Sequence, residues 1–542
     1  MKRRTFLKIA GMGGLSLAAG CDSRPEKNLF SQLRAPDDLV SGRATWYAST
    51  CRECPAGCGI LAKNIGGRIV KVEGNPMHPI NKGNLCMRGQ AVLQGIYNPD
   101  RIKTPLLKEK DGWRPISFPQ AQNLLKERAR TASRKGENRV SMLTEVAGEG
   151  LVGLFRETLK RWESDSLLLF EPFAYESLKT ANEKIFGFEG LVSYRLQEAD
   201  FLLSLGADFL ETWLSPVEYA RKFKQMHAFK NGEKGLFIHV SPFQSMTGAN
   251  ADLWGSCVPG TEATIALGLI HEALKDGRGT DLPIDFRNTL EEGALPYKKE
   301  KVIESSGIVP EIYERIITRL FRSSKPLILG TSTGGGGNHA LQANMAANLL
   351  NLVLDPDLTL IDFNNRHRVE KAVRRSDVLD YFEALNRDPI DLLMLHNVNP
   401  VHSLPEASHV RNALENENLF VVSFSNFMDE TTSLADLILP VSLPLETWDE
   451  YGGWSSIVST LQPTMGGLND GPHLGDVLLD AAWGSEKPVK NYQTYLMALL
   501  QRSEKIRGEK DWLKALQVGG IFDVPVQPDP SRPEKTSDGS EK

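Results

Sequence analysis

No stretch of the 542-residue chain is apolar for long enough to form a membrane-spanning helix, which takes about 20 residues. The sequence also contains no basic run, and its net charge is -5 at pH 7. A chain without a basic stripe is not expected to bind nucleic acid. Its hydrophobic content of 41% and charged content of 24% are ordinary for a soluble globular protein. A chain of this length should divide into several domains.

Cysteine is scarce, and four of the six cysteines lie close together in the sequence. Cys51, Cys54, Cys58 and Cys86 have the spacing C-x2-C-x3-C-x27-C. Thiolates bind zinc, Cu(I) or iron–sulfur clusters, and a cubane cluster takes one thiolate per iron. Three ligands on one tight loop and a distant fourth favour a [4Fe-4S] cluster. A zinc site and a pair of disulfides remain alternatives, although Cys86 lacks the nearby companion that zinc sites usually have.

The residues around these cysteines form a longer pattern. It begins with CRECPAGCGI, continues with GGRIVKVEGNPMHPINKGNLCMRGQA and ends with YNPDRIKTPL. This pattern resembles the N-terminal iron–sulfur domain of the molybdopterin (bis-guanine dinucleotide) oxidoreductases. The resemblance implies one [4Fe-4S] cluster, and it implies that Arg88 lies between the cluster and a pterin. A cation at that position would stabilise the reduced cluster, whereas the alternative is a simple exposed charge.

The first 20 residues are a targeting segment rather than part of the fold. Arg3 and Arg4, followed by TFLK, look like a twin-arginine signal, and LAAGC at the end of the apolar stretch resembles a lipobox. We therefore expect export by the Tat route to the periplasmic face of the cytoplasmic membrane, with Cys21 as a lipid-anchored N-terminus. Cleavage near Ala19 without lipidation, or an uncleaved signal, is the alternative. Residues 21–44 are expected to be a linker.

The rest of the chain alternates between short apolar runs and helical patterns, which indicates βαβ units and a parallel sheet. An internal echo supports two such units, since 201–261 and 392–444 each contain two strands and then Ala-Asp-Leu. We predict an α/β fold with a small N-terminal [4Fe-4S] domain and two interleaved Rossmann-like, doubly wound α/β domains. The predicted boundaries are 45–104, completed by about 440–490, for the cluster domain, 105–145 plus 320–440 for domain II, 146–319 for domain III, 491–524 for a helical end and 525–542 for a disordered tail.

The expected cofactor cleft lies at the carboxyl ends of the strands. Gly334, Gly335 and Gly336 follow a predicted strand, where backbone amides could hold a diphosphate, and an ordinary βα turn is the alternative. Asn399 lies in HNVNP, which resembles the family's loop near the guanosine. The loop that carries the molybdenum ligand in catalytic members corresponds roughly to 173–177, which has no cysteine, although Ser177 or Glu176 could ligate in principle.

The stretch LADLILPVSLPLETWDEYGG precedes the C-terminal barrel domain in that family, and the remaining chain is too short for such a barrel. We therefore expect no functional molybdenum site, no bound molybdopterin guanine dinucleotide and no catalytic residues. Two stretches, LFEPFAYESLKTANEKIFGFEGL and ADFLLSLGADFLETWLSPVEYARKF, look like the molybdopterin-like subunits of alternative complex III and of the menaquinone reductase complex.

The resemblance implies an electron-transfer subunit of a membrane-associated, quinone-linked respiratory oxidoreductase complex. The implied partners are a ferredoxin-like multi-cluster subunit, a polytopic quinone-binding membrane subunit and a multihaem cytochrome c. Two other functions remain open. One is a catalytic molybdenum or tungsten subunit whose barrel is on another chain, and the other is a structural scaffold whose cluster only stabilises the fold.

Overall fold

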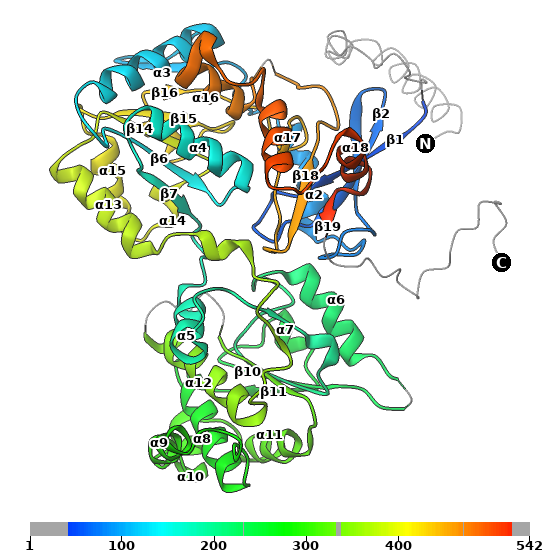
Figure 1. Cartoon of the computed structure of the whole chain (residues 1–542). Coiled ribbons are helices and arrows are strands. Elements are labelled where there is room, and N and C mark those ends of the chain that lie inside the picture. Colours follow the sequence, from blue (N-terminus) through cyan, green and yellow to red (C-terminus); the bar gives the residue numbers. More distant parts are fainter. Residues whose placement is uncertain (1–41, 231, 332–337, 470, 523–542) are drawn as a thin grey trace, which may run out of the picture.

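The structure is a computed structural model that describes residues 42–230, 232–331, 338–469 and 471–522. Figure 1 shows three parts: an N-terminal domain with β1 to β3, a first lobe around β6, β14 and β15, and a second lobe around β10 and β11. The N-terminal domain and the first lobe lie above the second lobe in this view. None of the described helices is long and apolar enough to cross a membrane.

The N-terminal domain is a three-stranded antiparallel sheet with one helix packed against β3. Strands β2 and β3 form a hairpin, with Gly66 and Gly67 at its turn in left-handed conformations that suit glycine (φ +61° and +84°). The Tyr97 hydroxyl donates to the Ile69 carbonyl oxygen at 2.9 Å and so ties the end of the helix to the sheet. The elements are β1 (Thr45–Thr50), β2 (Gly59–Ile65), β3 (Arg68–Gly74) and α2 (Met87–Ile96).

The first lobe is built on a seven-stranded sheet in the order β5-β4-β16-β15-β14-β6-β7. The five strands from β16 to β7 are parallel, and the β4–β5 hairpin adds an antiparallel edge. Its elements are β4 (Leu106–Glu109), β5 (Gly112–Pro115), α3 (Phe118–Ser133), β6 (Val140–Glu145), α4 (Glu149–Arg161), β7 (Leu167–Phe170), α13 (Arg375–Arg387), β14 (Leu392–His396), α14 (Pro400–Ser403), α15 (Ala407–Leu414), β15 (Phe420–Phe424), η4 (Thr432–Leu434) and β16 (Leu437–Ile438).

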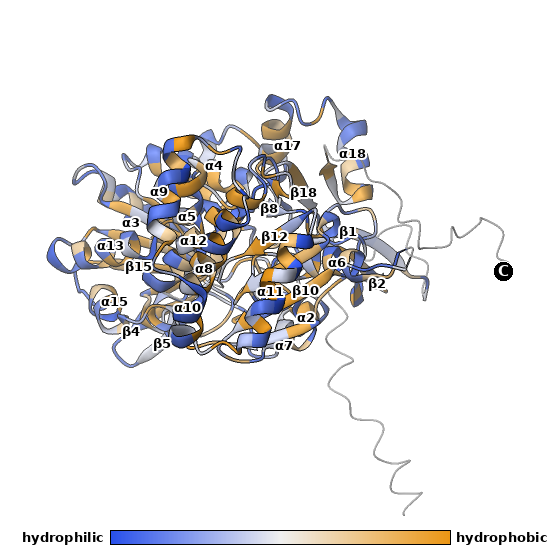
Figure 2. Cartoon of the chain, turned by 90° about the horizontal axis from the view of Figure 1, so that it is seen from below, coloured by the Kyte–Doolittle hydropathy of each residue, from blue (hydrophilic) through white to orange (hydrophobic). Residues whose placement is uncertain are grey.

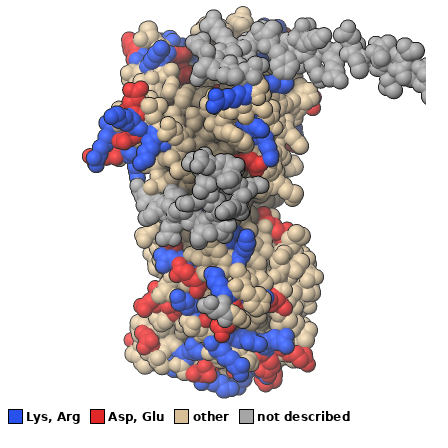
Figure 3. Space-filling view, turned by 90° about the vertical axis from the view of Figure 1, so that its right-hand side faces the viewer, with Lys and Arg blue, Asp and Glu red and all other residues tan. Residues whose placement is uncertain are grey.

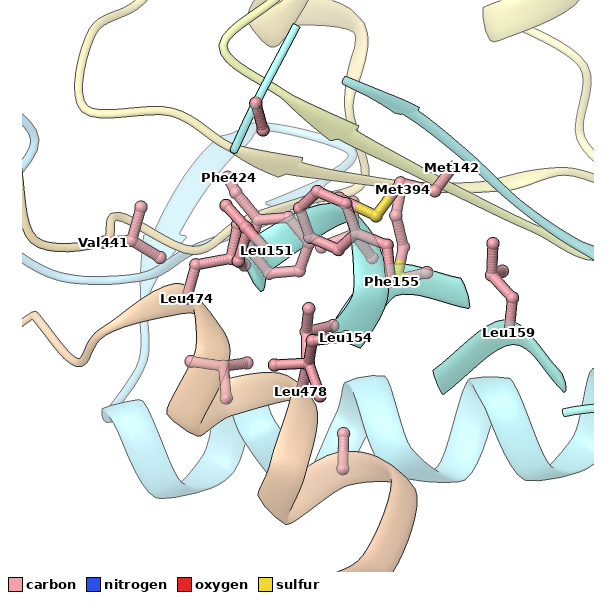
Figure 4. Close-up of a cluster of buried hydrophobic side chains, with 14 of the residues drawn as sticks. Met142, Leu151, Leu154, Phe155, Leu159, Met394, Phe424, Val441, Leu474 and Leu478 are labelled. Carbon is pink, nitrogen blue, oxygen red and sulfur yellow. The ribbon is translucent and has the colours of Figure 1, made fainter. Parts of the chain in front are cut away.

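Apolar cores cover both faces of this sheet. Alternate residues of a strand point to opposite faces, so Met142 packs with α3, α4 and α16, whereas Leu143 packs with α13 and α15. Figure 4 shows the first of these cores, where Leu151, Leu154 and Phe155 of α4 lie beneath the strands and face Leu474 and Leu478. Figure 2 shows hydrophobic residues gathered on the strands and inner helix faces. The first lobe is therefore doubly wound, as predicted.

The second lobe is built on a four-stranded parallel sheet in the order β11-β10-β9-β12. It too has a core on each face, with Leu203 on one side and Leu202 on the other. Its elements are α5 (Glu176–Phe186), β8 (Ser193–Tyr194), η2 (Leu196–Glu198), β9 (Phe201–Leu205), α6 (Pro216–His227), β10 (Leu236–Ser241), α7 (Met246–Ala249), β11 (Leu253–Ser256), α8 (Glu262–Lys275), α9 (Ile284–Ala294), α10 (Lys299–Ser306), α11 (Pro310–Arg322), β12 (Pro326–Leu329), α12 (Asn338–Leu354), β13 (Ile361–Asp362) and η3 (Arg368–Lys371).

The internal echo in the sequence corresponds to two matching strand triplets. The first copy forms β9, β10 and β11, and the second forms β14, β15 and β16. Both triplets are parallel, and both have the same neighbour order within their sheets. The chain leaves the first sheet after β7, builds the second lobe and returns to the first sheet at β14. The predicted interleaving of two α/β domains is confirmed.

Two of the predicted domain boundaries are wrong. The boundary after residue 145 separates β6 from β7, although β7 pairs with β6 in the first sheet. The range 320–440 assigns β12 to the first lobe, although β12 pairs with β9 in the second sheet. Strand and helix patterns predict that a buried strand exists, but they do not predict which sheet it joins. The crossovers therefore lie near 171–175 and 367–374.

The C-terminal segment returns to both the N-terminal domain and the first lobe. Helix α16 packs on α3 and α4, whereas β18 and α18 contact β1. The Thr50 hydroxyl donates to the Thr460 carbonyl oxygen at 3.1 Å, and the Asn75 amide donates to that of Val518 at 2.8 Å. The segment thus completes the N-terminal domain, in part over the predicted range of 440–490. Its elements are β17 (Asp449–Glu450), β18 (Ile457–Leu461), α16 (Leu474–Trp483), η5 (Gly484–Glu486), α17 (Tyr492–Arg502), α18 (Glu509–Val518) and β19 (Gly520–Phe522).

Candidate metal centre

Three of the four predicted ligands lie on the loop between β1 and β2. The antiparallel register pairs Thr50 with Gly59, and the Cys51 amide donates to the Cys58 carbonyl oxygen at 2.8 Å. This hydrogen bond closes the loop, so the chain between the two cysteines folds back on itself. Cys51 and Cys58 are buried, with 6% and 5% of their surface exposed, and Cys54 lies between them half-buried.

The fourth cysteine joins them from the start of α2. Cys86 is the residue before the helix, and its side chain makes no capping hydrogen bond there. Burial raises the pKa of the Cys58 thiol well above its ordinary value, and the charges of Cys51, Cys54 and Cys86 raise it further. Burial likewise raises the pKa of Cys51 to about 12. Four thiolates this close together need cationic compensation, which bound iron supplies.

The arrangement of the cysteines bears on the two alternatives to a cluster, a pair of disulfides and a zinc site. The four thiols are free, and no disulfide joins any cysteine in the described part of the chain. Within the same residues, no group of three or more His, Cys, Asp or Glu side chains is close enough to hold a single metal ion. The fold therefore presents no preformed mononuclear zinc site. A cubane cluster places its four ligands on four different irons, and these four cysteines, two buried and two half-buried, could supply them.

The cysteine loop is pressed against residues 451–453 of the C-terminal segment. The Tyr451 hydroxyl donates to the Pro55 carbonyl oxygen at 2.8 Å. A Cβ on Gly453 would lie 2.0 Å from the Ala56 carbonyl oxygen, and one on Gly57 (φ +61°) would lie 2.9 Å from the Gly453 amide nitrogen. Both glycines are therefore needed for the close approach of the two backbones.

Arg88 lies beside the two more exposed thiols. Burial lowers the pKa of its guanidinium, but Cys54 and Cys86 outweigh this and raise the pKa above its ordinary value. The side chain also hydrogen-bonds Cys86, and it lies near the carboxylate of Glu53. Arg88 thus lies next to two of the predicted ligands, and its place between a cluster and a pterin stays a prediction.

Arg52 was not predicted as a site residue, although it lies between two ligands in the sequence. Its guanidinium donates to the Val146 carbonyl oxygen at 2.8 Å, pairs with Glu145 Oε1 at 3.2 Å and lies 3.6 Å from the centre of the Tyr451 ring. Burial lowers the pKa of Arg52, but Glu145 and Tyr451 raise it above its ordinary value. An ion pair between residues so far apart in the sequence leaves no periodic signal, so only the position between two cysteines could have indicated it.

Both the fold and the cysteine site have counterparts among known proteins. The model for the molybdopterin oxidoreductase Fe4S4 domain matches residues 44–98, and the molybdopterin oxidoreductase model matches residues 101–464. The chain belongs to the molybdopterin oxidoreductase family. The first match covers all four cysteines and Arg88, which supports a [4Fe-4S] cluster as the metal centre.

Among relatives in this family, the chain is 28% identical to the menaquinone reductase, molybdopterin-binding-like subunit of Nitratidesulfovibrio vulgaris, over 92% of this chain and 74% of that protein. It is 24% identical to the periplasmic nitrate reductase of Desulfovibrio desulfuricans, over 83% of this chain and 66% of the relative. The acetylene hydratase of Pelobacter acetylenicus has a similar structure, with a TM-score of 0.69 at 15% identity, over 88% of this chain and 74% of the hydratase. That likeness supports the fold alone.

Asn399, predicted to lie near the guanosine of a pterin cofactor, has hydrogen-bond partners within the chain. Asn399 Oδ1 accepts from the Thr431 hydroxyl at 2.7 Å and from the His402 amide at 3.3 Å, and its Nδ2 donates to Glu430 at 2.7 Å. Asn399 therefore caps α14, and its side-chain amide keeps one N–H donor beyond these three hydrogen bonds. Contact between Asn399 and a guanosine stays a prediction.

The sequence indicates Glu176 and Ser177 as residues that could bind molybdenum in principle. Glu176 Oε1 accepts from the Arg375 backbone amide at 2.6 Å, which occupies only one of the lone pairs of its carboxylate. Ser177 lies in the first turn of α5. Metal binding by either residue stays a prediction. Gly334, Gly335, Gly336 and Cys21 lie outside the described residues.

An acidic pair lies behind the cysteine loop, on β17, with Glu450 buried and Asp449 half-buried. Asp449 Oδ1 accepts from the Tyr492 hydroxyl at 2.8 Å, and Glu450 Oε1 accepts from the Gly150 amide at 2.9 Å. Burial raises the pKa of Asp449 to about 7, and the adjacent Glu450 carboxylate adds to the rise. The pair joins β17 to α4 and α17.

Replacing Asp449 with asparagine should stabilise the protein at alkaline pH. The raised pKa means that the folded state holds this proton more tightly than the unfolded chain, so the stability gained is complete in acid and is lost as the pH rises through about 7. Asparagine still accepts from Tyr492 and cannot ionise. We expect Asp449→Asn to melt above the unaltered protein at about pH 8.5 and expect a smaller difference at about pH 5.5. The exposed Asp111→Asn is the control, and an equal difference at both pH values for Asp449→Asn would contradict this reading.

Proposed function

We propose that this chain is an iron–sulfur electron-transfer subunit of a membrane-associated, quinone-linked respiratory oxidoreductase complex, with the molybdopterin oxidoreductase fold but no functional molybdenum site. The observation that carries the proposal is the four-cysteine site, where four cysteines that could hold one [4Fe-4S] cluster lie together at the edge of the first lobe. One-electron transfer needs a cluster within tunnelling reach of the next centre and needs no nucleophile or general base.

The similarity to a menaquinone reductase subunit over 92% of this chain supports a quinone-linked complex. The proposed partners are a ferredoxin-like multi-cluster subunit, a polytopic quinone-binding membrane subunit and a multihaem cytochrome c. The proposed place is the periplasmic face of the cytoplasmic membrane, after Tat export and with Cys21 as the anchor. Labelling of Cys21 by a radioactive or clickable fatty acid tests the anchor, with Cys21→Ala as the control.

Within this function, the residues around the cluster would have separate tasks. The four cysteines hold the cluster, and the buried pair Cys51 and Cys58 keeps that side of it from water. Arg88 places a positive charge beside Cys54 and Cys86, where it favours the added electron. The cluster itself supplies the one-electron chemistry when bound.

Metal analysis of the native complex tests the proposal. The complex should be purified from its membrane, and iron, molybdenum and tungsten should be measured per chain, both in the complex and in the separated subunit. We expect about four irons on this chain and neither molybdenum nor tungsten. Stoichiometric molybdenum or tungsten would overturn the proposal in favour of a catalytic subunit. A cluster that no reductant reduces in the range of respiratory potentials would instead favour a structural scaffold.

A further inference from the structure

Arg52 connects the cluster loop to the carboxyl end of β6. Glu145 is the last residue of that strand, and Val146 follows it, so both contacts of the guanidinium lie where the strand ends. The Arg52 side chain is only 9% exposed, whereas that of Glu145 is 27% exposed. The backbone contact and the ring of Tyr451 fix the orientation of the guanidinium, and Glu145 supplies its counter-charge.

The position of the counter-charge is fixed as well. The Asn397 side-chain amide donates to Glu145 Oε1 at 3.1 Å. Asn397 has a left-handed backbone conformation (φ +49°), which aims this side chain from the loop after β14. The same carboxylate oxygen thus accepts from Asn397 and pairs with Arg52. The pair is held by two loops of the first lobe and by the cysteine loop.

Two cations therefore lie near the thiols, in different settings. Arg88 is on α2 at the exposed side of Cys54 and Cys86. Arg52 lies between Cys51 and Cys54 in the chain, its side chain is 9% exposed, and the buried ring of Tyr451 lies against its guanidinium. The positive charge of Arg52 also opposes the rise that burial causes in the pKa of the Cys54 thiol, so this charge acts on one of the predicted ligands. Solvent screens a buried charge much less than an exposed one, so Arg52 would act on a bound cluster more strongly than a surface charge at the same distance.

We propose that the Arg52–Glu145 ion pair sets the reduction potential of the cluster. Arg52 stabilises the reduced state, because the cluster gains one negative charge when it accepts an electron from a one-electron donor such as a neighbouring iron–sulfur centre. Glu145 offsets part of that effect. No covalent bond changes in this step. Both residues are positioning residues, and the inference rests on the proposed electron-transfer function.

An electron paramagnetic resonance redox titration of the purified complex tests the pair. Arg52→Gln should make the cluster harder to reduce, and Glu145→Gln, which keeps an oxygen to accept from Asn397, should make it easier to reduce. We expect each to change the ratio of reduced to oxidised cluster at fixed potential by about tenfold, which is about 59 mV for one electron. Arg52→Lys keeps the positive charge and should stay nearer to the unaltered protein.

The matched control is Arg114→Gln, which breaks the exposed Arg114–Glu109 pair on the β4–β5 hairpin and should leave the potential unchanged. Opposite shifts for Arg52→Gln and Glu145→Gln support the pair, because a merely loosened site would move both the same way. Shifts of the same sign, or none, would overturn it. If the Arg52→Gln protein loses its iron, the Glu145→Gln protein provides the test by itself. A higher reduction potential in Glu145→Gln supports the proposed role of the ion pair, and an unchanged potential refutes it. Failure of the proposed function is seen separately, in an unaltered cluster that cannot be reduced.

Discussion

A Cys58→Ala variant should lose most of the iron bound to this chain. Cys58 is 5% exposed, and the other three thiols all influence its charge, so it belongs to the buried side of the site. Alanine has no atom that binds iron, and a cubane cluster needs one thiolate per iron. We expect iron to fall from about four per chain to well below one, with loss of the cluster's visible absorbance and resonance signal. Iron per purified chain is the measurement.

The loss should extend to the fold of the N-terminal domain. Metal–thiolate bonds contribute much of the folding free energy of small metal-binding domains, and three of the ligands form the turn between β1 and β2. The variant should therefore melt earlier than the unaltered protein. Cys257→Ala is the matched control, because Cys257 is also a buried cysteine but lies in the second lobe, outside the site. Four irons retained by Cys58→Ala, or equal losses in both variants, would contradict the assignment of Cys58 as a ligand.

Glu446→Gln should lower the free energy of unfolding by about 3–5 kcal/mol, the usual cost of breaking a buried ion pair. Arg101 and Glu446 form two parallel hydrogen bonds of 3.0 and 2.8 Å, with side chains only 4% and 1% exposed. The glutamate also accepts from the amides of Leu443 and Leu468 at 3.0 Å each. Glutamine at this position leaves the buried Arg101 without a counter-charge. The side-chain NH2 of glutamine would also face the N–H groups of Arg101, Leu443 or Leu468, and two donors cannot form a hydrogen bond.

Denaturant unfolding of the iron-loaded protein measures this effect. The control is Glu109→Gln in the exposed pair with Arg114, where we expect a change of at most about 1 kcal/mol. A second variant, Arg101→Met combined with Glu446→Leu, removes both charges and should recover part of the loss. An effect of Glu446→Gln no larger than that of the control would show that the pair does not hold the C-terminal segment to the end of the N-terminal domain.

The sequence predicted most elements of this fold because their signals are local. The short apolar runs in LLMLHN and FVVSFS predict buried strands, and the repeated Ala-Asp-Leu predicts two related sheets. The allocation of β7 and β12 was not predictable in the same way, since Leu167–Phe170 would suit the middle of either sheet. Which sheet such a strand joins depends on packing with residues that are distant in the sequence.

The same distinction applies to the site. The spacing of the cysteines predicted the metal site, because three of the four predicted ligands lie on one short loop. Asn399 was assigned to a cofactor by its motif, whereas the structure gives it hydrogen bonds to Glu430 and Thr431. Arg52 and Glu145 were missed because their pairing depends on how β1 and β6 are brought together, and no pattern within either stretch encodes that contact.

The close approach of Gly453 to the cysteine loop has a consequence for biosynthesis. The four thiols of the site leave the ribosome early, but the loop around Gly453 that packs on the cysteine loop is made several hundred residues later. At roughly 5–20 residues per second, a nascent chain presents the thiols without their cover for about 20–70 seconds. Cluster delivery is easiest in that interval, while the loop can still be reached. Once Gly453 docks on Ala56, the same contact keeps an inserted cluster in place and closes an empty site to the delivery machinery.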